Sequence, residues 1–196
     1  EDNLRRTDPD LSQEKINEFV GEWNKELEPD WNKSLKEVDQ PRESKGPVSR
    51  EVFLKGEGVE AKVNEVATKH GFSMENLLNL INKESGFDTT AVNSKSKATG
   101  LIQFMPKTAK GLGTTIKKIG KMNILEQLDL IDKYFAQNHK KGEHPYITIA
   151  YPKAHNMGMD EIIATPSDSI AKQNPPWRNE DGNVTKRSII AYAERA

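Results

Sequence analysis

The stretch from Glu84 to Ala109, ESGFDTTAVNSKSKATGLIQFMPKTA, constrains the fold most, because it places a carboxylate at a helix end and follows it with a loop. Ser73 is a typical helix N-cap, and apolar residues recur after it at helical spacing. These apolar residues are Leu77, Leu78, Leu80 and Ile81. Gly86 predicts the end of the helix. We therefore expect Glu84 in the last turn, on or at the edge of the face that points inward.

Two effects are expected to keep the Glu84 carboxyl protonated near neutral pH. The partial negative charge at the C-terminal end of a helix disfavours a carboxylate, and burial raises the pKa of a carboxyl further. A protonated carboxylic acid can act as a general acid that protonates a leaving oxygen. Glu84 is therefore the candidate catalytic residue.

The segment after Glu84 predicts a loop and then a second helix start. Residues 89–99 are rich in Ser, Thr, Asn and Lys without a helical apolar period, and Pro106 suits the first turn of a helix. Gln103 interrupts the apolar run between them. Two roles stay open for it: its amide caps a nearby backbone group, or it projects into a cleft and hydrogen-bonds a sugar.

This segment resembles the soluble lytic transglycosylase family, which comprises lysozyme-like enzymes that cut bacterial peptidoglycan. The family pattern is Glu-Ser, a loop punctuated by small residues, Gly-Leu-Met/Ile-Gln, and then Met-Pro-x-Thr-Ala. It is matched at Glu84, Ser85, Ala91, Asn93, Ser96, Ala98, Gly100, Leu101, Ile102, Gln103, Phe104, Met105, Pro106, Thr108 and Ala109. The resemblance covers roughly residues 55–165 and implies a mainly α, lysozyme-like catalytic domain. The residues before it predict an N-terminal helical extension of this domain.

The resemblance also implies the residues of the site. The catalytic residue would be Glu84, with no metal and no cofactor. The substrate-binding residues would be Ser85, Gln103, Phe104, Met105, Tyr146 and Tyr151.

Two residues are candidates for the tyrosine that supports Glu84. The commonest family pattern is Ala-Tyr-Asn-Ala-Gly, but here Ala150-Tyr151 is followed by Pro152-Lys153-Ala154. Tyr151 fits the literal Ala-Tyr pair, whereas Tyr146 fits a variant with Pro six residues later. We favour Tyr146, and the other tyrosine is then expected to be a core residue with only its hydroxyl in water.

The resemblance further implies chemistry that needs one carboxylate. Glu84 would protonate the glycosidic oxygen and then accept a proton from the C6 hydroxyl of N-acetylmuramic acid, which closes onto C1 as a 1,6-anhydro end. A water-using muramidase would need a second carboxylate across the cleft. Asp88 lies past the helix end at Gly86, where a spacing of four no longer brings side chains together, so we expect it to cap the loop. A cell-wall-binding protein without turnover is the third alternative.

The first fifty residues predict a separate unit, so the expected domains are 1–50, a helical extension and linker, and 51–196, the lysozyme-like domain. Asp10 can cap a helix to about Leu27, and a second short helix is expected before a linker at residues 40–46. The apolar stripe of the first helix consists of Ile16, Phe19, Val20, Trp23 and Leu27, and the second apolar set is Trp31, Leu35 and Val38. These helices are expected to pack on the catalytic domain or to dock onto a partner.

Elsewhere, apolar spacing and caps predict helices at about residues 59–70, 123–135 and from Thr185 onward. No strand pair is expected. Trp177 is expected to anchor a core or interface rather than stack on a sugar. The sequence Asp181-Gly182-Asn183 predicts a turn rather than a calcium loop.

Composition argues against several classes of protein. A net charge of −1 disfavours general nucleic-acid binding, and the absence of cysteine leaves no disulfide or thiolate metal site. The four histidines have no metal-binding spacing and are expected at the surface or at helix ends. There is no apolar run long enough for a membrane span and no signal peptide. The chain begins with Glu1 rather than Met, so a processed product or a fragment of a longer protein is an open alternative.

Residues 106–141 carry eight lysines against three acids. This basic side is either a solvated face or one that faces the acidic stem peptides of peptidoglycan. The expected partners are peptidoglycan glycan strands and, through the N-terminal helices, phage tail or virion proteins. The Asn-Pro and Asp-Gly-Asn-Val-Thr ending is similar to that of some virion-associated members. The expected location is therefore the virion, with action in the bacterial periplasm or cell wall; a secreted or periplasmic bacterial enzyme is the alternative.

Overall fold

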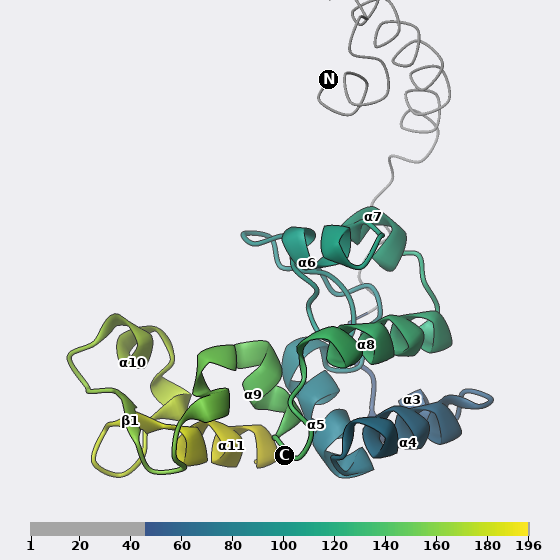
Figure 1. The fold of residues 1–196 in the computed structure, drawn as a ribbon. Helices are drawn as coiled ribbons and strands as arrows, with labels where there is room; N and C mark the ends of the chain where they lie inside the picture. The colour runs from purple at the N-terminus through teal and green to yellow at the C-terminus, as the bar shows by residue number, and fades with distance from the viewer. Residues whose placement is uncertain (1–45, 196) are drawn as a thin grey trace, which may run out of the picture. The chain divides into compact units, whose positions relative to one another are not determined.

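The computed structural model describes residues 46–195, which form a mainly helical unit (Figure 1). The helices are α3 (Arg50–Leu54), α4 (Val59–His70), α5 (Met74–Ser85), α6 (Pro106–Gly111), α7 (Ile116–Ile119), α8 (Ile124–Asn138), α9 (Pro145–Ala150), α10 (Ser169–Gln173) and α11 (Lys186–Glu194), with 3-10 turns η1 (Pro152–Asn156) and η2 (Pro175–Trp177). The two strands are β1 (Ile162–Ala164) and β2 (Val184–Thr185). The helices predicted between Asp10 and Val38 lie outside the described residues. Within residues 46–195 no helix is both long enough and apolar enough for a membrane span.

Helix α5 begins and ends where the sequence predicts. Ser73 accepts a hydrogen bond from the Asn76 backbone N–H, and the Asn76 side chain in return accepts one from the Ser73 backbone, which forms a capping box. Gly86 ends the helix in the left-handed conformation, with φ of 57°. The four apolar residues predicted for its inward face are all fully buried. Glu84 therefore occupies the last turn, as predicted.

Helices α4 and α8 pack together, and α4 also packs on α5. Helix α4 ends at Gly71, and α8 begins after Asn123 with a capping box to Glu126, both as predicted. Leu125, an apolar residue of α8, is 37% exposed. It stands in the first turn and lines a cavity, and the buried stripe of this helix begins only with Gln127 and Leu128.

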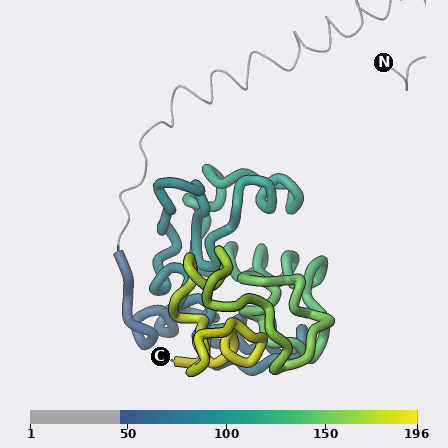
Figure 2. Tube along the Cα trace, turned by 90° about the vertical axis from the view of Figure 1, so that its left-hand side faces the viewer, coloured from purple at the N-terminus to yellow at the C-terminus, as the bar shows by residue number. Residues whose placement is uncertain are grey.

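The segment with α6 and α7 lies on one side of α8, and α4 lies on the other (Figures 1 and 2). Gln127, fully buried on α8, holds this segment. Its Oε1 accepts a hydrogen bond from the Leu101 backbone N–H at 2.9 Å, and its Nε2 donates to the carbonyls of Thr89 at 2.8 Å and Ile119 at 3.1 Å. Gly100 has φ of +84°, and a Cβ there would lie 2.5 Å from Gln127 Oε1. The turn before Gln103 therefore depends on one buried amide and one glycine.

The C-terminal part contains the antiparallel strand pair β1–β2, in which Ile162 faces Thr185 and Ala164 faces Val184. The prediction of no strand pair was wrong, because strands of three and two residues are too short to show an alternating pattern. Thr185 caps α11, as predicted, and α11 packs against both α5 and α9. A buried ion pair between Lys186 and Glu143 holds the first turn of α11 beside the segment that leads into α9.

Candidate active site

The Glu84 side chain is half-buried in the last turn of α5 and forms no hydrogen bond or ion pair within residues 46–195. The backbone behind it is fixed. The Val48 N–H donates to the Gly86 carbonyl at 2.9 Å, and a Cβ on Gly86 would lie 2.8 Å from the Pro47 Cβ. The carboxyl is thus positioned by a rigid helix end, while its oxygens stay available to a ligand.

Burial raises the pKa of the Glu84 carboxyl to about 7. Of the two causes expected from the sequence, burial accounts for this shift, because desolvation favours the neutral form. No neighbouring cation lowers the pKa. At neutral pH a large fraction of Glu84 is therefore protonated, which is the state that a general acid needs.

Tyr146 is the tyrosine that the structure brings near Glu84. It lies on α9 and is 6% exposed. Burial is the main reason that its pKa is raised, and the negative charges of Glu84 and Tyr192 raise it further, whereas a hydrogen bond from Trp177 acts in the opposite direction. The Tyr146 hydroxyl therefore stays protonated and remains a hydrogen-bond donor beside Glu84.

Tyr151 occupies a different position. It is half-buried at the junction between α9 and η1, and its backbone N–H donates to the Ile147 carbonyl. Within the described residues it has no interaction with Glu84. The structure thus brings Tyr146, but not Tyr151, to the candidate acid.

Two further aromatic residues stand next to Tyr146. The Trp177 ring lies edge-on to it at 6.5 Å, and the Tyr192 ring is tilted at 5.8 Å, both between ring centroids. The ammonium of Lys83, which precedes Glu84, lies 4.9 Å from the centroid of the Tyr192 ring. Trp177 thus packs as an anchor, as expected. The sequence analysis missed Tyr192 because only the packing of α11 on α5 and α9 brings it to the site.

The side chains of Ser85 and Gln103 both donate hydrogen bonds to backbone carbonyls. The Ser85 hydroxyl lies 3.1 Å from the Ile81 carbonyl and 3.0 Å from the Leu101 carbonyl, and so ties α5 to the turn that follows Gly100. Gln103 has φ of 53°, and its Nε2 donates to the carbonyls of Ala91 and Gly100. The capping role considered for Gln103 is therefore present. Its Oε1 accepts no hydrogen bond within residues 46–195, so the amide oxygen can still accept one from a ligand.

Phe104 and Met105, both predicted to bind substrate, differ in the structure. Phe104 is 2% exposed and packs edge-on against Tyr134, with ring centroids 6.3 Å apart. Its side chain belongs to the core and offers no surface to a saccharide, so that prediction is corrected. Met105 is 47% exposed and immediately precedes α6, where it can contact a ligand.

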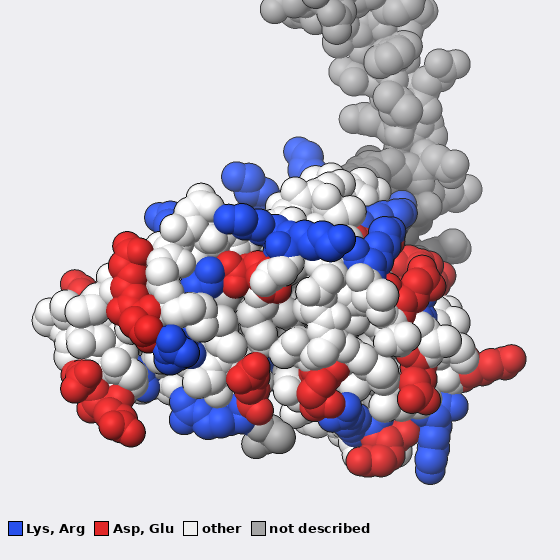
Figure 3. Space-filling view, turned by 60° about the horizontal axis from the view of Figure 1, so that its bottom comes forward, with Lys and Arg blue, Asp and Glu red and all other residues white. Residues whose placement is uncertain are grey.

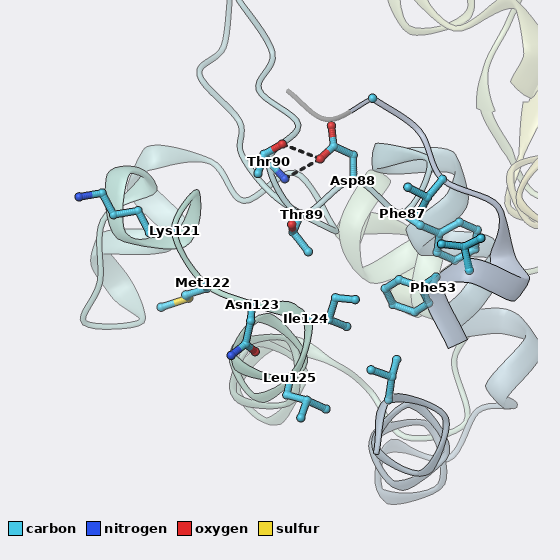
Figure 4. Close-up of a pocket in the computed structure, with 14 residues that line it drawn as sticks. Phe53, Phe87, Asp88, Thr89, Thr90, Lys121, Met122, Asn123, Ile124 and Leu125 are labelled. Atoms are coloured by element: carbon cyan, nitrogen blue, oxygen red, sulfur yellow. Dashed lines mark hydrogen bonds between the residues drawn. The ribbon is translucent and has the colours of Figure 1, made fainter. Parts of the chain in front are cut away.

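Asp88 caps a loop and does not act as a second carboxylate for Glu84. The Thr90 backbone N–H and hydroxyl both donate to its Oδ1, at 2.8 and 2.6 Å, so it caps the loop as expected. Together with Phe53, Phe87 and the start of α8 it lines a cavity of about 470 Å³ (Figure 4). The rings of Phe53 and Phe87 lie 4.8 Å apart in its wall. None of the predicted site residues lines this cavity, so it is distinct from the candidate active site.

The described residues contain no group of three His, Asp or Glu side chains that could hold a metal ion. The histidines serve the fold. His144 caps α9 by accepting the Tyr146 N–H, and His70, the last residue of α4, pairs with Asp132 at 2.7 Å. The helix-end roles expected for histidines are therefore present at these two positions.

The model of the transglycosylase SLT domain family matches residues 62–172, which is more than half of the chain. The chain belongs to this family. No curated protein matches it. The SLT match spans Glu84, the turn at Gly100 and both candidate tyrosines, and it ends before Trp177 and Tyr192. Membership confirms the lysozyme-like, mainly helical fold class and supports a transglycosylase-type, peptidoglycan-cleaving function.

Substitution of Tyr146 and of Tyr151 by phenylalanine, one at a time, distinguishes the roles of the two tyrosines. Tyr146→Phe removes a hydrogen-bond donor beside the acid and keeps the ring packing, so we expect turnover on peptidoglycan to fall by about ten- to a hundredfold. Tyr151→Phe serves as the matched control, with a change of less than about twofold. Release of soluble glycan fragments measures both. A larger loss for Tyr151→Phe would make Tyr151 the supporting residue.

Proposed function

We propose that this protein is a peptidoglycan lytic transglycosylase. It cleaves the β-1,4 bond between N-acetylmuramic acid and N-acetylglucosamine and leaves a 1,6-anhydro end on the muramic acid. The observation that carries the proposal is Glu84, a half-buried carboxyl with a pKa raised to about 7 and no carboxylate among the causes of that shift. Family membership supports the substrate class.

One carboxyl suffices for this reaction because the nucleophile belongs to the substrate. Protonated Glu84 gives its proton to the glycosidic oxygen as the bond from C1 to that oxygen breaks. The resulting Glu84 carboxylate takes the proton of the muramic acid C6 hydroxyl while the C6 oxygen bonds to C1. Glu84 donates one proton and accepts one, so it ends the reaction protonated, as it began. Positioning of the C6 hydroxyl next to C1 accounts for much of the rate acceleration.

The surroundings of Glu84 support this route over hydrolysis. A hydrolase places a second carboxylate across the scissile bond, as a base for water or as a nucleophile. Asp88, the nearest acid after Glu84 in the chain, is bonded to Thr90 and lines the separate cavity. The charge of Glu84 raises the pKa of Tyr146, so the Tyr146 hydroxyl stays neutral and acts as a hydrogen-bond donor rather than as a base.

Mass spectrometry of digested peptidoglycan tests the proposal. The anhydro product is lighter than the hydrolysis product by one water, and it has no reducing end. We expect anhydro ends from the wild-type protein. Reducing ends would instead show a water-using muramidase, and the absence of products would show a cell-wall-binding protein.

We propose that the setting of this reaction is local wall degradation by a phage particle. The support is the sequence similarity of the Asn-Pro and Asp-Gly-Asn-Val-Thr ending to virion-associated members. Detection of the protein in purified particles, with proteins of the infected cell as the control, tests this. Recovery only from the medium or periplasm of uninfected bacteria would favour a secreted or periplasmic enzyme.

A further inference from the structure

Residues 89–125 contain seven lysines and no Asp, Glu or Arg. We call these lysines the lysine lobe: Lys95, Lys97, Lys107, Lys110, Lys117, Lys118 and Lys121. All seven are exposed, and none forms an ion pair within residues 46–195. Figure 3 shows basic side chains gathered along its upper edge, the side on which α6 and α7 lie in Figure 1.

Elsewhere in the described part some lysines have acidic partners, namely Lys62, Lys69 and Lys186, whereas others, such as Lys55 and Lys133, form no ion pair within residues 46–195. Lys62 pairs with Glu65 and Asp129, and Lys69 pairs with Asp132. A surface that serves only solubility usually mixes both signs, because like charges repel one another. Favourable positions at helix ends explain part of the lobe, since Lys110, Lys117 and Lys118 stand in last turns. They do not explain why acids are absent over the whole segment.

The lysine lobe adjoins the candidate active site. The Leu101 carbonyl within this segment lies 3.0 Å from the hydroxyl of Ser85, the residue after Glu84. The exposed Met105 leads directly into α6, which carries Lys107 and Lys110. A polymer that runs from Glu84 toward Met105 and α6 would pass a surface of one sign of charge.

We propose that the lysine lobe binds the carboxylates of acidic stem peptides on the glycan strand that is cleaved at Glu84. This inference rests on the proposed function, because it takes the substrate to be peptidoglycan. Seven clustered positive charges concentrate a polyanion near the site and speed its association. The attraction between exposed charges falls as salt shortens the screening length.

Binding is measured in the Glu84→Gln background, so that the polymer stays intact. The ligand is soluble, uncrosslinked peptidoglycan, compared with the same polymer after carbodiimide coupling to ammonia, which converts its carboxylates into amides. We expect affinity at low salt to fall by about tenfold or more on amidation. We expect the same loss from the fourfold variant with Lys107, Lys110, Lys117 and Lys118 changed to Gln.

The matched control changes four other exposed lysines to Gln, namely Lys55, Lys133, Lys153 and Lys172. It has the same net charge as the lobe variant and is expected to bind within about twofold of its parent. Equal losses in both variants would show a net-charge effect and overturn the proposal, as would equal binding of the amidated polymer. The amidation arm decides the question even if the lobe variant fails to fold. Product analysis of the wild-type protein is independent of this result, so failure of the lobe and failure of the proposed function are distinguishable.

Discussion

Glu84→Gln is expected to lower the rate of peptidoglycan cleavage by about a thousandfold or more, because it removes the proton donor and the later proton acceptor together. Glutamine keeps the size and the hydrogen-bonding oxygen of the side chain. Helix α5 is held by its Ser73 cap and by the Val48 contact at Gly86, so the fold is expected to persist. Release of anhydro ends measures the loss. A variant with full activity would remove Glu84 from the mechanism.

The same substitution has a pH signature in stability. The pKa of Glu84 is raised on folding from 4.5 to about 7, so the folded state binds more protons than the unfolded state between these values. The stabilisation that this group contributes to the folded state is therefore lost as pH rises from 4.5 to about 7. A glutamine side chain, which is neutral at every pH, avoids that loss. We expect the free energy of unfolding of Glu84→Gln to exceed that of the wild-type protein by about 1–3 kcal/mol at pH 8. At pH 4 we expect no difference between the two.

Activity of the wild-type protein should depend on the same group and fall in the same direction of pH. Only the protonated carboxyl can donate, so turnover is expected to fall as pH rises through about 7. Denaturant unfolding at both pH values, together with a pH–rate profile, checks the two effects. A stability gain that is the same at pH 4 and pH 8 would mean that Glu84 is not held in a desolvating site.

Gln127→Leu is expected to lower the free energy of unfolding by about 3 kcal/mol or more. The substitution leaves the Leu101 N–H and the Thr89 carbonyl without a partner inside the protein, and each such buried group costs about 1–3 kcal/mol. The Ile119 carbonyl loses one of its two hydrogen bonds and keeps the one from the Met122 N–H. Turnover is expected to fall as well, because the turn that carries Gln103 loses its support from α8. Chemical denaturation measures the first effect and fragment release the second.

Gln137→Leu is the matched control, since Gln137 is exposed near the end of the same helix. We expect a change within about 0.5 kcal/mol, as for most surface substitutions. If Gln127→Leu were as mild as Gln137→Leu, the segment with α6 and α7 would be held by its apolar contacts rather than by this amide.

The features that could be predicted from sequence are those with local causes. The helix starts at Ser73, Asn123 and Thr185 follow from side chains that cap backbone N–H groups three residues later. Glu84 in a last turn follows from the apolar spacing before it and from Gly86. The cap at Asp88 is local as well. These predictions required no knowledge of how distant segments pack.

What could not be predicted depends on such packing. Phe104 lies inside a motif that the family resemblance associates with substrate, yet its ring fills the core against Tyr134. Gln127 is a polar residue in an ordinary helical pattern, and only the fold shows that three segments converge on it. Tyr192 reaches the site because α11 folds back onto α5. The predictions for the N-terminal helices lie outside the described residues.

The contact between Val48 and Gly86 affects where this protein can be shortened. Both the predicted domain boundary at residue 51 and the start of the SLT match at residue 62 fall after Val48. A chain trimmed at either place would leave the Gly86 carbonyl without its 2.9 Å hydrogen bond and would uncover the glycine that Pro47 covers. We therefore expect the smallest active unit to include Pro47 and Val48, which lie behind Glu84 and outside the limits of the family domain.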